Sequence, residues 1–293
     1  MFNRILVPLD GSSASEAVLP YARTLALGLG VVVELLSVVD PDELRVGTDA
    51  AAGAASAQSY LAALGAEFPR VETAALIGNP SEFIAQRAAA NADTLVMMST
   101  HGQSRIKHLA MGKVTDKVLR MVEQPLLVVH GQDEAPRAGH AMVDCIFLPL
   151  DGTEASEEAM PVAVELAKRM ALPMDIVRTI PIVEQAARDR GRLSIRSSAE
   201  GEAAGYLACH SERARALGVE HVYSETLLGS PQDKLMDLAE QNPHGLMVMS
   251  THGRSGLGRW ILGSVSDRLV RNSPQPVLLI KPGCLGQRDL DES

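Results

Sequence analysis

Aromatic residues and cysteines are scarce in this chain. Phe, Tyr and Trp make up 3% of its 293 residues, whereas all hydrophobic residues together make up 46%. The core is therefore expected to be aliphatic, built from Val, Leu, Ile, Ala and Met. The three cysteines, Cys145, Cys209 and Cys284, are odd in number, far apart and without metal-ligand spacing. This pattern argues against a disulfide framework or a zinc site and favours reduced thiols in a cytosolic protein.

The chain also lacks excess positive charge and long apolar runs. Its formal net charge is −9, which disfavours sequence-independent binding of nucleic acid, although a local cluster of N–H groups can still bind one small anion. The longest uncharged run, residues 50–66, consists mostly of Ala, Ser and Gly and is too weakly apolar to span a bilayer. The N-terminus runs straight into a strand-like segment rather than a signal peptide. We expect a soluble cytoplasmic protein with neither a membrane nor a nucleic acid as partner.

The most prominent feature of the sequence is an internal repeat. Residues 5–11 recur as residues 146–152, at an offset of 149 − 8 = 141 for the shared proline. From Gly78-Asn79-Pro80 onward the offset is 229 − 78 = 151, so the second copy carries ten extra residues, which we expect within 184–198. We predict two domains, 1–132 and 143–282, joined by a linker at 133–142 and followed by a tail at 283–293.

Strands alternate with helices in each copy. In copy one, the strands are expected at 5–9, 31–39, 71–77, 95–98 and 126–129. Helices are expected at 13–27, 50–64 and 112–122, with one more capped by Asn79 and started by Pro80. Pro20 inside the first helix implies a kink or a late helix start. The pattern predicts an α/β fold with a Rossmann-like, five-stranded parallel sheet in each domain.

Two loops in each copy have the chemistry of a ligand site. Residues 250–264 join an apolar strand to a helix N-terminus, whose unpaired N–H groups suit a phosphate, and residues 99–113 repeat the plan. Asp10-Gly11-Ser12 and Asp151-Gly152-Thr153 follow the first strand of each copy. If the first and fourth strands are neighbours, both loops face one crevice at the carboxyl edge of the sheet, which suits a nucleotide. Alone, each Asp-Gly-Ser/Thr loop is also an ordinary helix cap.

These residues resemble the universal stress protein family in its tandem form, over almost the whole chain. ATP-binding members carry a G-x2-G-x9-G-[ST] pattern, an acid that holds ribose, and a proline and a second-strand residue that flank adenine. In copy two the resemblance implies a site made by the following residues: Pro149, Asp151, Thr179, Ser250, Gly253, Gly263, Ser264 and Val265. In copy one it implies Pro8, Asp10, Val38, Gly102, Gly112 and Lys113.

The chain departs from the family pattern at two positions. Ser99 and Ser250 replace the first glycine in both copies, and Lys113 replaces the final Ser or Thr in copy one. Copy two therefore fits the pattern better. Lys113 offers a cation to a phosphate, but its bulk equally suits a closed pocket.

The resemblance implies a stress-responsive regulator that binds ATP with Mg²⁺ on its phosphates and acts on a regulatory protein partner through a population shift. It also implies a pseudo-dimer in which the two fifth strands pair antiparallel, and it allows a homodimer of whole chains. We do not expect an enzyme, since the sequence contains no recognisable set of residues suited to efficient hydrolysis. A non-nucleotide interaction module and a slow ATPase remain alternatives. His101 and His252 are read as pocket or loop residues, and Asp116 and Asp267 as helix-dipole partners rather than metal ligands.

Overall fold

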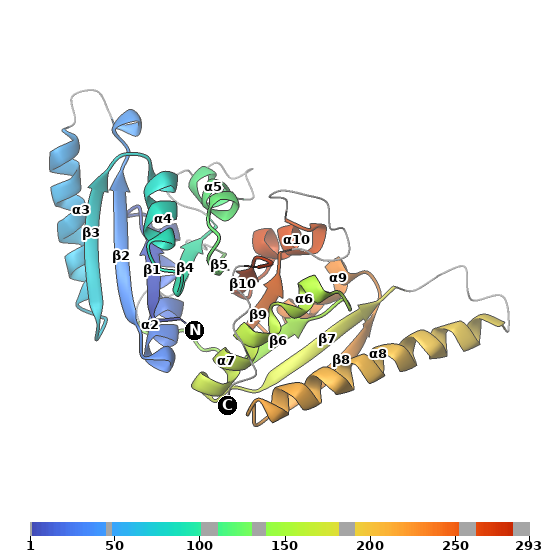
Figure 1. Cartoon of the computed structure of the whole chain (residues 1–293). Coiled ribbons are helices and arrows are strands. Elements are labelled where there is room, and N and C mark those ends of the chain that lie inside the picture. Colours follow the sequence, from blue (N-terminus) through green and yellow to red (C-terminus); the bar gives the residue numbers. More distant parts are fainter. Residues whose placement is uncertain are drawn as a thin grey trace. The chain divides into compact units, whose positions relative to one another are not determined.

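The computed structural model describes residues 2–44, 49–100, 111–130, 139–181, 191–251 and 262–283, with the backbone alone for 191–198. The chain divides into two compact units, chiefly Met1–Met142 and Val143–Leu269 with Ser273–Pro282. Each unit is a sheet flanked by helices (Figure 1), so the predicted α/β class is confirmed. The domain boundaries at 132 and 143, and the pairing of the two fifth strands, stay predictions.

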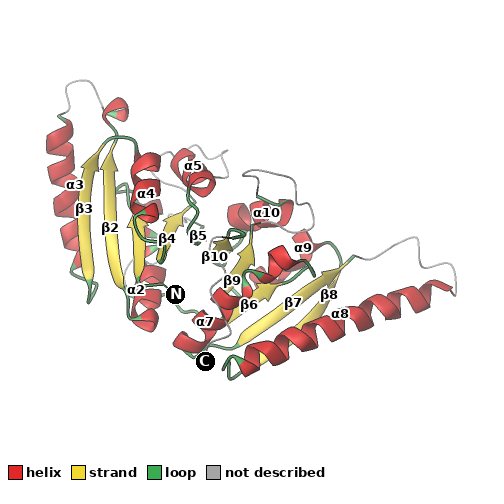
Figure 2. Cartoon of the chain, in the orientation of Figure 1, coloured by secondary structure: helices red, strands yellow, loops and turns green. Residues whose placement is uncertain are grey.

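The first unit follows the expected alternation of strands and helices (Figure 2). Its strands are β1 (Arg4–Pro8), β2 (Val32–Val39), β3 (Val71–Ile77), β4 (Thr94–Ser99) and β5 (Leu126–Val129). Its helices are α1 (Ser13–Glu16), α2 (Leu19–Leu29), α3 (Ala50–Gly65), α4 (Pro80–Ala89) and α5 (Lys113–Met121), with a 3₁₀ turn at Pro41–Glu43.

The second unit repeats this order element by element. Its strands are β6 (Cys145–Pro149), β7 (Met174–Ile180), β8 (Val222–Leu228), β9 (Gly245–Ser250) and β10 (Val277–Ile280). Its helices are α6 (Glu154–Glu157), α7 (Met160–Met170), α8 (Gly191–Ala216), α9 (Pro231–Gln241) and α10 (Ser264–Asn272). Among the described helices, none is both long and apolar enough to cross a membrane.

Both sheets have the same topology. The strand order is β3-β2-β1-β4-β5 in the first unit and β8-β7-β6-β9-β10 in the second, and neighbouring strands within each unit are parallel. Right-handed crossovers then place α2 and α3 on one face and α4 and α5 on the other. All six residues of β4 and of β9 are buried, as suits strands covered on both faces.

Proline sets where the first long helix of each unit begins. The predicted helix over 13–27 is split, because a single turn, α1, precedes α2, which starts at Leu19 with Pro20 in its first turn. A proline at this position costs no hydrogen bond, since the first N–H groups of a helix have no intrahelical partner. Pro161 does the same in α7. Of the two readings of Pro20, the late helix start is therefore confirmed.

The extra residues of the second copy are divided between two places. Tyr60 of α3 and Tyr206 of α8 each donate a hydrogen bond to the equivalent glutamate, Glu16 or Glu157, which makes them counterparts at an offset of 206 − 60 = 146. Five of the ten extra residues therefore precede Tyr206, and five follow it, where α8 continues to Ala216. The prediction that all ten lie within 184–198 was wrong.

A buried ion-pair network crosses the first sheet at β1 and β2. Glu34, the charged residue within the apolar second strand, has a side chain only 3% exposed. Its Oε2 accepts a hydrogen bond from Nη1 of Arg4 at 2.8 Å, and its Oε1 lies 3.4 Å from Nη1 of Arg87. Arg4 also donates to the hydroxyl of Thr94 at 3.0 Å. The buried carboxylate is thus compensated by two guanidinium groups.

The second copy keeps the acid of this network but not its partners. Asp175 takes the place of Glu34, whereas Cys145 and Leu238 stand where the two arginines would be. Within the part of the chain that the structure describes, its Oδ1 is buried without a hydrogen-bond partner. Burial, followed by the charge of Glu225, raises the pKa of Asp175 from 3.8 to about 6. Burial, with the charges of Asp175 and Asp144, raises the pKa of the Cys145 thiol to about 12.

Replacing Asp175 with Asn should remove a pH-dependent destabilisation. The folded-state pKa is raised above the unfolded value, so wild-type stability is lost as the pH rises from 3.8 through about 6. With a discount for the partly exposed carboxyl, the variant should be about 1–2 kcal/mol more stable at neutral pH and equal to wild type in acid. Urea unfolding of both proteins across this pH range measures the difference. A difference that did not vary with pH would contradict the prediction.

Candidate functional site

The first and fourth strands of each unit are neighbours, as the two-loop crevice requires. β1 pairs with β4 through Arg4, Ile5 and Leu6, and β6 pairs with β9 in the same way. From β1 the chain crosses to β2 on one side, and from β4 it crosses to β5 on the other. The strand order therefore reverses between β1 and β4, and their carboxyl ends form the switch point at which open α/β sheets bind ligands.

The loop after the first strand holds its aspartate in a defined turn. In copy one, Oδ1 of Asp10 accepts hydrogen bonds from the backbone N–H and the hydroxyl of Ser12, at 2.9 and 2.6 Å. Ser12 in turn caps α1 by accepting from the N–H of Ser15. Asp151, Thr153 and Ser156 repeat these contacts in copy two. The side chains of Ser12 and Thr153 therefore cap the helices. Their hydrogen bonds to Asp10 and Asp151 orient these two carboxylates at the edge of the crevice.

The loop after the fourth strand ends on a helix that is tied to that strand. In copy one, the N–H of Gly112 donates to the carbonyl of Thr100 at 2.7 Å, and the hydroxyl of Thr115 donates to the carbonyl of Ser99 at 3.0 Å. These bonds fix the start of α5 next to the end of β4. The first-turn N–H groups of Lys113, Val114 and Thr115 have no partner within the helix and point out of its N-terminus.

The equivalent helix of copy two begins in the same way. The N–H of Gly263 donates to the carbonyl of Thr251 at 3.0 Å, and the hydroxyl of Ser266 donates to the carbonyl of Ser250 at 3.2 Å. Ser264 is exposed at the first position of α10, and Val265 follows it. Pro149 and Thr179 lie at the carboxyl ends of β6 and β7.

In copy one, the first loop and the described ends of the second line one cavity of about 540 Å³. The site residues predicted there that line it are Pro8, Asp10, Val38, Gly112 and Lys113. Gly102 and Gly253 lie outside the described residues, as do His101 and His252. A volume of this size is typical of small-molecule sites.

One wall of the cavity was missed by sequence reasoning. It is formed by Ser56, Ala57 and Tyr60 of α3 together with Ser37 of β2. Tyr60 is held in place because its hydroxyl donates to Oε1 of Glu16 on α1 at 2.8 Å. The Tyr-Leu-Ala triplet that begins at Tyr60 recurs at Tyr206, and this repeat was the signal that could have pointed to the wall.

Charge is separated along the cavity. Asp10, Asp40 and Glu43 supply carboxylates at the ends of β1 and β2, whereas Lys113 supplies an ammonium group at the start of α5. Asp116, one turn further into α5, pairs with Arg120 at 3.1 Å. The described residues contain no group of three His, Cys, Asp or Glu side chains suited to a metal ion. A ligand with hydroxyl groups at one end and negative charge at the other would match this distribution. Its hydroxyl groups would face the carboxylates, and its negative charge would face Lys113.

Comparison with known proteins places both copies in one family. A profile of the universal stress protein family matches residues 1–130 and again 142–281. A universal stress protein of Methanocaldococcus jannaschii is 33% identical over 149 residues, which cover 50% of this chain and 86% of the relative. One from Mycolicibacterium smegmatis is 26% identical over 205 residues. These residues cover 66% of this chain and 64% of the relative, which is less than two thirds of its length.

Solved structures show the same fold over both units. A universal stress protein from Archaeoglobus fulgidus superposes with a TM-score of 0.73 at 20% identity, covering 95% of this chain and 98% of that one. A protein from Pseudomonas aeruginosa, described as a putative universal stress protein, gives a TM-score of 0.65 at 14% identity, covering 96% and 93%. The chain therefore belongs to the universal stress protein family and carries two copies of its domain.

Proposed function

We propose that this protein is an ATP-binding regulator whose nucleotide lies in the cavity of copy one. The observation that carries the proposal is that Asp10, Val38 and Lys113, which come from three separate segments, line a single cavity at the switch point of the sheet. The sequence pattern favours copy two, whereas this proposal places the nucleotide in copy one.

The lining suits each part of an adenine nucleotide. The carboxylate of Asp10 would accept hydrogen bonds from ribose hydroxyls, and Pro8 and Val38 would flank the apolar faces of the base. The first-turn N–H groups of α5 and the ammonium group of Lys113 would bind the phosphates. Mg²⁺ would be held chiefly by the phosphates themselves, which supply the oxygen ligands that this ion prefers.

Binding rather than catalysis is the proposed activity. The described lining of the cavity contains no arginine and no glutamine, the residue types that stabilise transferred phosphoryl charge or orient water in efficient nucleoside triphosphatases. ATP would instead favour one arrangement of the loops around the crevice and so change the surface offered to a regulatory partner in the cytoplasm.

Substitution of Lys113 tests the phosphate end. Replacing it with Ser, the residue at the equivalent position of copy two, should weaken ATP binding by about tenfold or more, because a charge-assisted hydrogen bond contributes about 1.5–3 kcal/mol. Adenosine, which has no phosphate, should bind both proteins equally. Calorimetric titration measures both ligands. An equal loss for ATP and adenosine would show instead that the substitution disturbs the whole pocket.

A further inference from the structure

One residue beside the crevice differs sharply between the two copies. Ser37 of β2 is buried and lines the cavity of copy one, and its counterpart 141 residues later is Arg178 of β7. Two neighbouring features are shared, since Asp10 and Asp151 form the same turn and Tyr60 and Tyr206 bond equivalent glutamates. The exchange of a small hydroxyl for a long cation therefore falls on matched scaffolds.

The space above the first loop is open in one copy and filled in the other. Gly11 and Gly152 have similar left-handed backbones, with φ of 78° and 88°. A Cβ atom added to Gly11 would meet nothing within 4 Å, whereas one added to Gly152 would lie 2.8 Å from Nη2 of Arg178. The guanidinium group thus covers the backbone directly after Asp151, the residue expected to hold a ribose.

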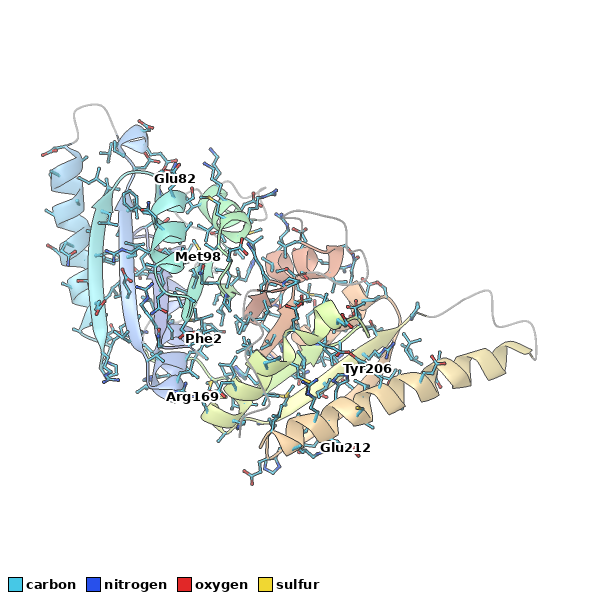
Figure 3. All side chains as sticks on the ribbon, viewed as in Figure 1. Phe2, Glu82, Met98, Arg169, Tyr206 and Glu212 are labelled. Atoms are coloured by element: carbon cyan, nitrogen blue, oxygen red, sulfur yellow. The ribbon has the colours of Figure 1, made fainter. Side chains whose placement is uncertain are left out.

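Aromatic and polar groups on α6 and α8 hold this arginine in place. Its Cζ lies over the ring of Tyr206, 4.5 Å from the centroid, within the range of a cation–π contact. The hydroxyl of Tyr206, a residue labelled in Figure 3, donates to Oε1 of Glu157 at 2.7 Å. His210 packs against the same ring, with 4.3 Å between ring centroids, and its Nε2 lies 3.4 Å from that carboxylate oxygen.

We propose that Arg178 closes the crevice of copy two, so that the chain holds one nucleotide, in copy one. This inference rests on the proposed ATP binding and assigns it to one of the two crevices. A ribose at Asp151 would have to displace a guanidinium group that is stacked on Tyr206 and lies against the loop. In copy one, Ser37 leaves the same volume free.

Exchanging the two residues tests the closure. Wild-type protein titrated with ATP–Mg²⁺ should bind one equivalent, and Arg178→Ser should bind two. The added equivalent should disappear when Gly263→Val is introduced as well. The matched variant Ser37→Arg should lose the single equivalent, provided that circular dichroism and thermal unfolding show it folded.

The double variant Ser37→Arg/Arg178→Ser should move the site between the copies. It should bind one equivalent, now abolished by Gly263→Val and indifferent to Gly112→Val. If Ser37→Arg fails to fold, the gain in Arg178→Ser decides alone. Two equivalents in wild type, or no gain in Arg178→Ser, would overturn the closure while leaving ATP binding intact. No binding in wild type and none in Arg178→Ser would refute the proposed function and this inference with it.

Discussion

Replacing Arg4 with Leu is expected to lower the free energy of unfolding by about 3–5 kcal/mol, because it leaves a buried carboxylate short of a partner. Glu34 is 3% exposed, and Arg4 makes the closer of its two ion pairs, at 2.8 Å against 3.4 Å for Arg87. Leu would also leave the hydroxyl of Thr94 without its guanidinium donors. Urea denaturation followed by circular dichroism measures the loss.

Two further variants separate an uncompensated charge from lost packing. Arg87→Leu removes an arginine that is 41% exposed, and it should cost about 1 kcal/mol or less. Replacing Arg4 and Glu34 together with Leu should recover most of the stability, since no buried charge then remains. If the double variant were as unstable as Arg4→Leu alone, the cost would lie in packing and the electrostatic account would be wrong.

Gly245→Thr in the second copy is expected to cost about 2–3 kcal/mol through overpacking. A Cβ atom at Gly245 would lie 2.4 Å from Cε2 of Phe147 and 2.5 Å from Nε2 of Gln275. Copy one carries Thr94 at this position and Leu6 in place of the phenylalanine. The two copies thus fill the same part of the core with different pairs, a large ring beside glycine or a smaller side chain beside threonine.

Phe147→Leu should rescue Gly245→Thr, since together they recreate the pair of copy one. The double variant should be more stable than the sum of the single effects predicts, with a coupling of about 1 kcal/mol or more. Thermal unfolding of wild type, the two single variants and the double variant gives the double-mutant cycle. If the two effects were simply additive, glycine would be required at position 245 by the local backbone or by Gln275. It would not be required because the ring of Phe147 needs the space.

Topology was the most predictable feature, because the repeat and the strand pattern constrain it together. Once two copies alternate strand and helix, right-handed crossovers leave few arrangements, and the neighbouring β1 and β4 follow. Local chemistry placed the caps at Asn79 and Ser12. Ser230, the counterpart of Asn79 in copy two, makes no side-chain capping bond to α9. The sequence left open whether Pro20 kinks the first helix or marks its late start. The observed break between α1 and α2 was needed to decide for the late start.

The missed features depend on contacts between distant segments. Glu34 is a charged residue within an apolar strand, and it is explained by Arg4 and Arg87, which lie 30 residues before and 53 residues after it. Arg178 carries no local signal, since its role follows from packing against Gly152 and Tyr206. Motif matching favoured copy two because it counted matches to the family pattern, which does not include Ser37 and Arg178. The proposed closure of copy two by Arg178, stacked on Tyr206, would reverse that preference.

The nucleotide content of the wild-type protein tests the central claim most directly. Freshly purified protein would be denatured, the released nucleotide identified by chromatography, and the nucleotide-free protein titrated with ATP–Mg²⁺ in a calorimeter. We predict one equivalent of ATP per chain, lost in Gly112→Val and kept in Gly263→Val. No released nucleotide and no heat of binding would contradict ATP binding and leave a protein-interaction module as the better account of this chain.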